Sequence, residues 1–412
     1  MKSFVRPIFH LLLIASITSC SKGKITIITT ESGSSRIQFG AEKLAGTLSE
    51  AGYEVIRTTG QVLPEQGKTI IIGELDTALI GLVSPVVELR SYEISGSESF
   101  LIRSGKDVLV VSGFDPSGIL YGCIELSKRI QNAEKLPEQI DYTDKPEMIL
   151  RGTCIGLQKT TYLPGRKVYE YPYTPDNFPW FYDKELWIRY LDMLVENRMN
   201  AMFLWNGHPF ASLVRLQDYP YAVEVDDDTF RKNEEIFNFL TVEAGKRGIW
   251  VIQMFYNIIV SKPFAEHHGL ETQDRSRPII PVIADYTRKS VAAFIEKYPN
   301  VGLMVCLGEA IGTDEDDIRW FTETIIPGVK DGLKTHGRTD EPPVVLRGHD
   351  TRADQVMEAA LPIYQNLYTT HKYNGESLTT YEPRGSWAQI NRDLPDGSRP
   401  TGRDLRCGES CE

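Results

Sequence analysis

Acidic residues that directly follow apolar segments are the first candidates for chemistry in this chain. Glu309 follows the almost wholly apolar stretch Val301–Leu307, with one glycine between them. Apolar surroundings disfavour the charged form of a carboxyl and raise its pKa, which suits a general acid that protonates a glycosidic oxygen. The alternative is a structural carboxylate bonded to Arg347 or to neighbouring backbone. We favour the catalytic interpretation.

Two residues qualify as the second carboxylate of such a pair. Glu376 and Asp350 each follow a short apolar segment, although Asp350 also fits the cap of a helix near Ala353 and Glu376 fits an ordinary loop position. If Glu309 and Glu376 face each other across a pocket, their separation of roughly 6.5–9.5 Å favours inversion, against about 5–5.5 Å for retention. The identity of this group stays open, and it could also lie in a further part of a longer protein.

Polar side chains follow the other apolar segments in the same way. Residues just after the strands of an alternating strand–helix barrel face its active site. Sugar hydroxyls need many directed hydrogen bonds, so this set predicts a carbohydrate site. The candidate substrate-binding residues are Asn206, His208, Tyr256, Asn257, Arg347, His349, His371, Tyr373 and Asn374.

Positive charge and aromatic rings accompany these residues. Arg347, His349, Lys372 and Lys159 suit the carboxylate of a uronic acid, or they pair with the acidic candidates. The aromatic residues between positions 169 and 182 either stack on sugars or pack a loop over the barrel. For His208, the competing interpretation is a loop histidine whose hydrogen bonds are made within the protein.

The elements that position these residues alternate between strand and helix. Apolar strands are predicted at 149–155, 201–205, 250–254, 301–307, 343–347 and 366–370, with helices at 184–197, 228–246, 286–298 and 353–364. The acidic run Asp314–Asp317 is predicted to be the start of a helix rather than a metal site. This alternation predicts parallel strands and a (β/α)8-type TIM barrel over residues 146–385.

The predicted barrel is incomplete. Six strands are recognisable instead of eight, and after Tyr381 the chain is polar and rich in Gly, Pro, Arg and Asp. A barrel that lacks two units exposes an unpaired strand edge. Either the chain is a truncated form of a longer protein or a partner supplies the missing units. We favour truncation, with 386–412 as a polar tail without ordered structure.

The strand and helix patterns of residues 21–145 predict a separate, small α/β sandwich. Strands are expected at 24–30 and 69–73, and the pair 100–103 and 108–111 predicts a hairpin. Helical spacing of apolar residues marks one helix ending at Gly52 and another that Asp115 caps and Pro116 begins. This domain holds no plausible catalytic group.

This domain resembles a known accessory domain. Ser99-Phe-Leu-Ile-Arg103, Val108–Gly113, Gly118–Gly122 and Glu125-Leu126 are similar to the domain that precedes the barrel in α-glucuronidases and β-hexosaminidases. The resemblance covers most of the domain. It implies a glycoside hydrolase and, from the α-glucuronidases, an acid at the end of the fourth barrel strand, which is the place of Glu309.

The N-terminus indicates export. Lys2 and Arg6 precede the apolar run Ile8–Ile17, which is too short to span a bilayer and is typical of a removable signal segment. The ending Ile17-Thr-Ser-Cys20 resembles a lipobox, in which Cys20 is acylated. We expect a lipid-anchored protein of the cell envelope, with residues 1–20 as the signal; an ordinary signal peptide is the alternative.

The overall composition limits the classes of partner that this chain can bind. A net charge of −11 over 412 residues argues against nucleic acid, because its binding needs a basic face. The six cysteines show no metal-like spacing, and Cys123, Cys154 and Cys306 have the apolar neighbours of core residues. We expect no metal and no cofactor.

Three functions fit these observations. The favoured one is an α-glucuronidase-like glycoside hydrolase acting on polysaccharide-derived oligosaccharides. A β-hexosaminidase-like hydrolase would need an adjacent Asp-Glu pair at the fourth strand, where this chain has Gly308-Glu309. A surface glycan-binding lipoprotein without turnover is the non-enzymatic alternative.

Overall fold

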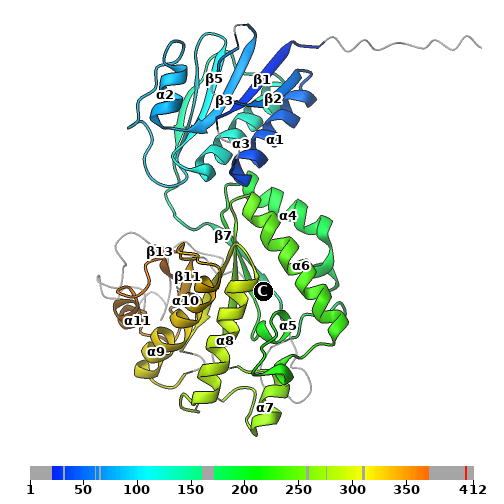
Figure 1. The fold of residues 1–412 in the computed structure, drawn as a ribbon, viewed down its shortest axis with the longest axis vertical. Coiled ribbons are helices and arrows are strands. Elements are labelled where there is room, and N and C mark those ends of the chain that lie inside the picture. The colour runs from blue at the N-terminus through cyan, green and yellow to red at the C-terminus, as the bar shows by residue number, and fades with distance from the viewer. Residues whose placement is uncertain are drawn as a thin grey trace, which may run out of the picture.

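The chain forms two sheets with helices packed on them (Figure 1). The computed structural model describes residues 21–30, 33–60, 62–64, 66–159, 171–256, 259–274, 276–308 and 311–370, and the backbone of 404–405. No helix within these ranges is long and apolar enough to cross a membrane.

The first sheet has six strands in the order β2-β1-β3-β5-β4-β6. Strands β2, β1, β3 and β5 are parallel, and β4 runs antiparallel to both β5 and β6. The strands are β1 (Lys24–Thr29), β2 (Glu54–Thr59), β3 (Lys68–Glu74), β4 (Phe100–Ser104), β5 (Val108–Gly113) and β6 (Asp141–Asp144). The predicted hairpin is therefore confirmed as β4 and β5.

Helices cover both faces of this sheet. Helices α1 (Ser35–Glu50) and α3 (Pro116–Ala133) pack against each other on one face, and α2 (Thr77–Val83) lies on the other. On β3, Ile70 and Ile72 join the core under α1 and α3, and Ile71 joins the core under α2. As predicted, Asp115 caps α3, because its carboxylate accepts the Gly118 N–H at 2.8 Å.

The second sheet is parallel and curled, with its strands in chain order from β7 to β13. It is an incomplete TIM-type barrel, so the predicted α/β fold class is confirmed. The strands are β7 (Gly152–Gly156), β8 (Ala201–Trp205), β9 (Trp250–Tyr256), β10 (Val301–Cys306), β11 (Val344–Arg347), β12 (Leu367–Thr370) and β13 (Asp404–Leu405).

Helices cover the convex side of this sheet (Figure 1). The longer ones are α4 (Lys184–Glu196), α6 (Asp227–Lys246), α8 (Pro281–Lys297) and α10 (Ile326–Thr335), and the shorter ones are α5 (Phe210–Leu213), α7 (Lys262–His268), α9 (Asp314–Trp320) and α11 (Ala353–Ala360). Helix α9 begins at Asp314, so the predicted helix start at the acidic run is confirmed.

Alternate residues of each barrel strand belong to two different cores. On β8, Phe203 and Trp205 lie in a cluster that contains no helix residue, whereas Met202 and Leu204 lie in the core beneath the helices. Since side chains alternate along a strand, the first pair faces the concave side of the sheet. This parity determines which strand-end residues reach the interior of the barrel.

Several expectations need correction. A strand was not expected after Tyr381, yet β13 pairs in parallel with β12 there; two residues are too few to show periodicity, and the open edge of β12 provides their hydrogen bonds. The edge strand β2 was missed because five of its six residues are exposed. Cys123 and Cys306 are buried as expected, but Cys154 is only partly buried.

Candidate functional site

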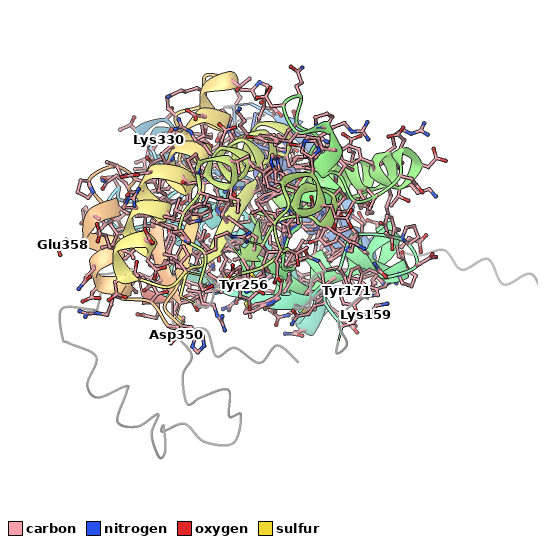
Figure 2. The ribbon with its side chains drawn as sticks, turned by 90° about the horizontal axis from the view of Figure 1, so that it is seen from below. Lys159, Tyr171, Tyr256, Lys330, Asp350 and Glu358 are labelled. Carbon is pink, nitrogen blue, oxygen red and sulfur yellow. The ribbon has the colours of Figure 1, made fainter. Side chains whose placement is uncertain are left out.

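The C-terminal ends of the barrel strands bring the candidate residues to one side of the molecule. Figure 2 shows Lys159, Tyr171, Tyr256 and Asp350 along the same side, with Lys330 of α10 on the opposite side. These four residues follow or lie near the ends of β7, β9 and β11. This is the end at which parallel barrels carry their active sites.

The concave face ends in a row of side chains that are in register across four strands. Cys306 of β10 pairs with Tyr256 of β9 and with Arg347 of β11, and Arg347 pairs with Thr370 of β12. Trp205 of β8 lies one step below this row, because it pairs with Met254, two residues before Tyr256. Of these five residues, only Tyr256 and Arg347 were predicted for the site.

Arg347 and Trp205 form the centre of this arrangement. The Arg347 side chain is only 4% exposed, and its guanidinium carbon lies 4.9 Å from the centre of the Trp205 ring. The Tyr256 ring lies 6.3 Å from Trp205 and edge-on to it. A guanidinium held on an aromatic face offers fixed donors to an anion or a hydroxyl, and the rings offer stacking faces for a sugar.

Asn206 is positioned away from this row. It is fully buried, and its amide nitrogen donates to the carbonyl oxygens of Leu157 and Tyr171, both at 2.9 Å. Its side-chain oxygen accepts the His208 N–H at 3.0 Å. Asn206 comes two residues after Leu204, so its side chain lies on the same face as that of Leu204, which faces the helices. We therefore correct its predicted substrate-binding role: it holds the strand-end loops together.

His208 is also a packing residue. It is 6% exposed, and its Nε2 lies 2.9 Å from the Tyr286 hydroxyl of α8. Its ring also packs edge-on against Phe210. The sequence allowed two interpretations of His208, a substrate-binding residue or a loop histidine whose hydrogen bonds are made within the protein. This placement supports the second, and the substrate-binding role is corrected accordingly.

The loop after β11 carries Asp350 and His349. Asp350 is exposed, with a left-handed φ of 56°, and His349 is half-buried. Helix α11 has Arg352 at its cap position, so the alternative that Asp350 caps this helix is wrong. Asp350 is thus available at the strand end, as its candidacy for the second carboxylate requires.

Several predicted residues lie outside the described residues. These are the catalytic candidates Glu309 and Glu376, the binding candidates Asn257, His371, Tyr373 and Asn374, and Cys20 and Lys372. Their roles stay predictions. Gly308, the residue before Glu309 in the sequence, is described and follows β10 after Leu307.

The aromatic loop before α4 packs on the barrel. Tyr173, Phe178 and Phe181 are buried, and the Tyr173 hydroxyl donates to the Gln253 side-chain oxygen at 3.2 Å. Lys159 lies 5.6 Å from the centre of the buried Tyr171 ring. The packing interpretation holds for these rings; Tyr169 lies outside the described residues.

A buried acid that was not predicted for the site lies beneath these loops. Asp317 of α9 is 2% exposed, and burial, with smaller contributions from Asp314, Asp316 and Asp350, raises its pKa to about 7. A hydrogen bond from Thr351 acts in the opposite direction. The sequence places Asp317 in a helix start, but only the packing of α9 reveals its burial.

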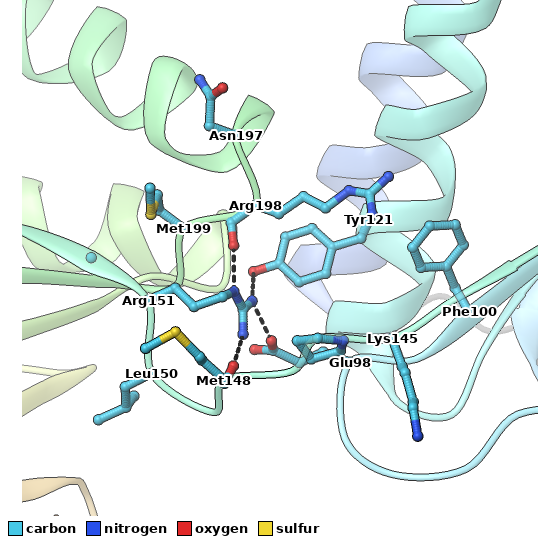
Figure 3. A pocket seen from close by; sticks show the side chains of 12 residues that line it. Glu98, Phe100, Tyr121, Lys145, Met148, Leu150, Arg151, Asn197, Arg198 and Met199 are labelled. Carbon is cyan, nitrogen blue, oxygen red and sulfur yellow. Dashed lines mark hydrogen bonds and ion pairs between the residues drawn. The ribbon is translucent and has the colours of Figure 1, made fainter. Parts of the chain in front are cut away.

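Two cavities lie at the opposite ends of the strands, between the two sheets. One of about 450 Å³ is lined mainly by apolar side chains with Arg151 and Glu98 between them (Figure 3). The other has a volume of about 620 Å³, and Asp115 and Trp250 are among the residues that line it. We do not place the site there, because barrel chemistry is carried by the C-terminal ends of the strands. Among the described residues, no group of three or more His, Cys, Asp and Glu could hold a metal.

The comparisons agree with this fold. No protein-family model matches the chain, and no curated protein matches it. The chain is 59% identical to the solved structure of a GH138 enzyme targeting pectin rhamnogalacturonan II, with a TM-score of 0.79, over 90% of this chain and 51% of that one. The chain thus spans about half the length of that enzyme.

Two more distant structures share the fold. A β-N-acetylhexosaminidase from Bacteroides fragilis is 15% identical, with a TM-score of 0.50, over 85% of this chain and 71% of that one. The Flavobacterium johnsoniae chitobiase is 13% identical, with a TM-score of 0.51, over 95% and 62%. The arrangement of a small α/β domain before a barrel, expected from the sequence, therefore recurs in solved glycoside hydrolases. The expected likeness to α-glucuronidases stays a prediction.

Proposed function

We propose that this chain belongs to a glycoside hydrolase that removes sugar residues from pectin-derived oligosaccharides. The observation that carries the proposal is the 59% identity, over 90% of the chain, to an enzyme that targets pectin rhamnogalacturonan II. The row of Tyr256, Cys306, Arg347 and Thr370 above Trp205 supports it, because this row lies at the end of the strands where parallel barrels carry their active sites.

The sugar released is proposed to be a uronic acid, as the α-glucuronidase-like interpretation implies. Pectin is acidic, and the guanidinium of Arg347 is fixed on the Trp205 ring, where a planar donor fork can hold a carboxylate. Glu309 acts as the general acid, and Glu376 or Asp350 as the second carboxylate. No cofactor enters this mechanism.

The enzyme is proposed to work at the cell envelope, anchored by a lipid on Cys20. This follows from the signal-like start and the Ile17-Thr-Ser-Cys20 motif. Labelling of the growing cells with a fatty-acid analogue tests the anchor: the label should enter the wild-type protein and be lost in Cys20→Ser.

Hydrolysis of aryl glycosides, including uronides, and of pectin-derived oligosaccharides tests the activity. The chain should release one sugar, and Glu309→Gln should lower turnover of the oligosaccharide at least about a hundredfold, because an unprotonated leaving oxygen departs slowly. Glu315→Gln, the same change at an exposed position of α9, is the matched control and should keep full activity.

The aryl glycosides separate the two carboxylate roles. A variant that lacks the acid keeps turnover of substrates with good leaving groups, whereas loss of the second carboxylate is not rescued in this way. Binding of oligosaccharide without release of any sugar, unchanged in Glu309→Gln, would instead support a glycan-binding protein.

A further inference from the structure

Lys159 is an exposed cation at the end of the barrel strands where the candidate site lies. It follows the last residue of β7 by three positions, and Figure 2 shows it on the side of the molecule that also carries Tyr256 and Asp350. Its Nζ lies 5.6 Å from the centre of the Tyr171 ring and 6.0 Å from the centre of the Phe178 ring. The attraction between an ammonium and aromatic faces holds the side chain in this place.

The two rings form a fixed support for this lysine. Tyr171 and Phe178 are only 4% and 3% exposed, and they pack edge-on with their centres 6.4 Å apart. The side-chain amide of Asn206 donates to the carbonyl oxygens of Tyr171 and Leu157, both at 2.9 Å. Asn206 therefore ties the segment that leads into Lys159 to the segment that carries the rings.

Lys159 lies further out along the barrel than the contact between Arg347 and Trp205. The Leu157 N–H donates to the Trp205 carbonyl oxygen at 2.7 Å, so the chain leaves β7 directly beside Trp205. Lys159 comes two residues later, which is up to about 7 Å further along an extended chain. It is exposed, whereas Arg347 and Trp205 are buried. Arg347 thus belongs to the interior of the strand-end region and Lys159 to its rim.

The charge of Lys159 is not neutralised within the part of the chain that the structure describes. Its ammonium has ring contacts there but no ion pair. The other described lysines that contact aromatic rings each pair with a carboxylate as well; they are Lys43, Lys184, Lys289 and Lys297. In a chain of net charge −11, an ordered cation without an acidic partner is suited to an anionic group of a ligand.

We propose that Lys159 is a specificity-determining residue, which binds a carboxylate on the sugar next to the one that is released. A terminal sugar held by Arg347 and Trp205 directs the rest of its oligosaccharide toward solvent, past the rim where Lys159 lies. The proposal rests on the proposed function, because it requires that an acidic oligosaccharide enters at the strand ends. It adds a second acidic sugar to the substrate: Arg347 holds the carboxylate of the released uronic acid, and Lys159 holds that of its neighbour.

Two matched disaccharides test this assignment on the full chain. One consists of two uronic acids, and the other is the same disaccharide methyl-esterified at its reducing-end sugar, which removes one charge. The wild type should prefer the free acid by about threefold to fivefold in kcat/KM, the range of an exposed ion pair. This preference should fall toward one at high ionic strength, because salt screens exposed charges.

Substitutions then assign the preference to one side chain. Lys159→Met should use the two disaccharides equally, and Lys159→Arg should keep the preference because it keeps the charge. Lys330→Met is the matched control: it removes the same charge from α10 on the opposite side of the molecule (Figure 2) and should keep the preference. A preference that persists in Lys159→Met, or that is lost equally in Lys330→Met, overturns the proposal.

An aryl uronide separates the two sugars of the substrate. It has no second sugar, so Lys159→Met should keep its kcat/KM within about twofold of the wild type. An equal loss on the aryl uronide and on the disaccharide overturns the proposal, because Lys159 would then act on the released sugar or on the fold. If the wild type hydrolyses nothing, the proposed function fails, and the ratio of the Kd values for the two disaccharides decides the role of Lys159 by the same criteria.

Discussion

At the scale of single residues, the burial of Asp317 carries a cost in stability. Its pKa is raised from 3.8 to about 7, so between these pH values the folded chain holds a proton that the unfolded chain has released. Stability from this group is therefore full below pH 3.8 and is lost as the pH rises to about 7. The loss is at most about 4 kcal/mol.

We therefore expect Asp317→Asn to be more stable than the wild type at pH 8, by on the order of 1–3 kcal/mol, and to differ little near pH 4. Denaturant unfolding of both chains at the two pH values measures this. A variant that is less stable than the wild type at pH 8 would contradict the assignment of a buried, charged carboxylate.

Arg347 contributes more than its charge. Its guanidinium is fixed on the Trp205 ring, a geometry that an ammonium group on a flexible stem does not reproduce. Arg347→Lys should lower kcat/KM for the proposed uronide by about tenfold or more, although the net charge is unchanged. Arg352→Lys, an exposed substitution on the same loop, should leave kcat/KM unchanged. Equal effects of the two changes would refute a special role for the contact between Arg347 and the Trp205 ring.

At the scale of elements, the close approach of the β10 and β11 ends depends on one glycine. A Cβ at Gly308 would meet the Asp350 carbonyl oxygen at 1.7 Å, whereas a Cβ at Gly156, the last residue of β7, would meet nothing within 4 Å. Both glycines lie near the C-terminal end of a barrel strand: Gly156 is the last residue of β7, and Gly308 lies two residues after β10.

Gly308→Ala should therefore destabilise the chain by about 2 kcal/mol or more and reduce turnover, because one of the two loops must move. Gly156→Ala should change stability by less than about 1 kcal/mol. Thermal unfolding and the glycoside assay check both. If the two variants behave alike, the contact between the loops is not a constraint on the fold.

At the scale of the whole molecule, an ion pair connects the two sheets. Arg151 donates to Glu98 at 2.5 Å, and their side chains are 17% and 12% exposed. The same guanidinium also donates to the carbonyl oxygens of Met148 at 2.6 Å and Arg198 at 2.8 Å (Figure 3). Glu98 in turn accepts from Asn200, just before β8, at 2.9 Å.

Removing Arg151 leaves the partly buried charge of Glu98 without its cation and the carbonyl oxygens of Met148 and Arg198 without a donor. Arg151→Met should cost about 3 kcal/mol and should separate the unfolding of the first sheet from that of the barrel. Arg215→Met, which breaks the exposed pair with Asp227, should cost less than about 1 kcal/mol. Denaturant curves followed by circular dichroism distinguish them; a single, unshifted transition in Arg151→Met would show that the pair does not couple the sheets.

The sequence by itself determined most of the strands, most of the longer helices and the set of strand-end residues. These follow from local physics: apolar runs such as Val301–Leu307 must be buried, and Asp115 with Pro116 starts a helix wherever it occurs. The acidic run at Asp314 was predicted correctly for the same reason. Glu309 and Arg347 were recognisable because they end such runs.

Only the tertiary structure decided which strand-end residues face the interior. Asn206 and His208 follow β8 just as Tyr256 ends β9, but the Asn206 side chain bonds to the carbonyl oxygens of the loop residues Leu157 and Tyr171, and His208 bonds to Tyr286 of α8. Trp205 and Asp317 were missed because burial and register arise from contacts between distant segments. Such contacts are set by the packing of whole elements, and no local pattern in the chain encodes them.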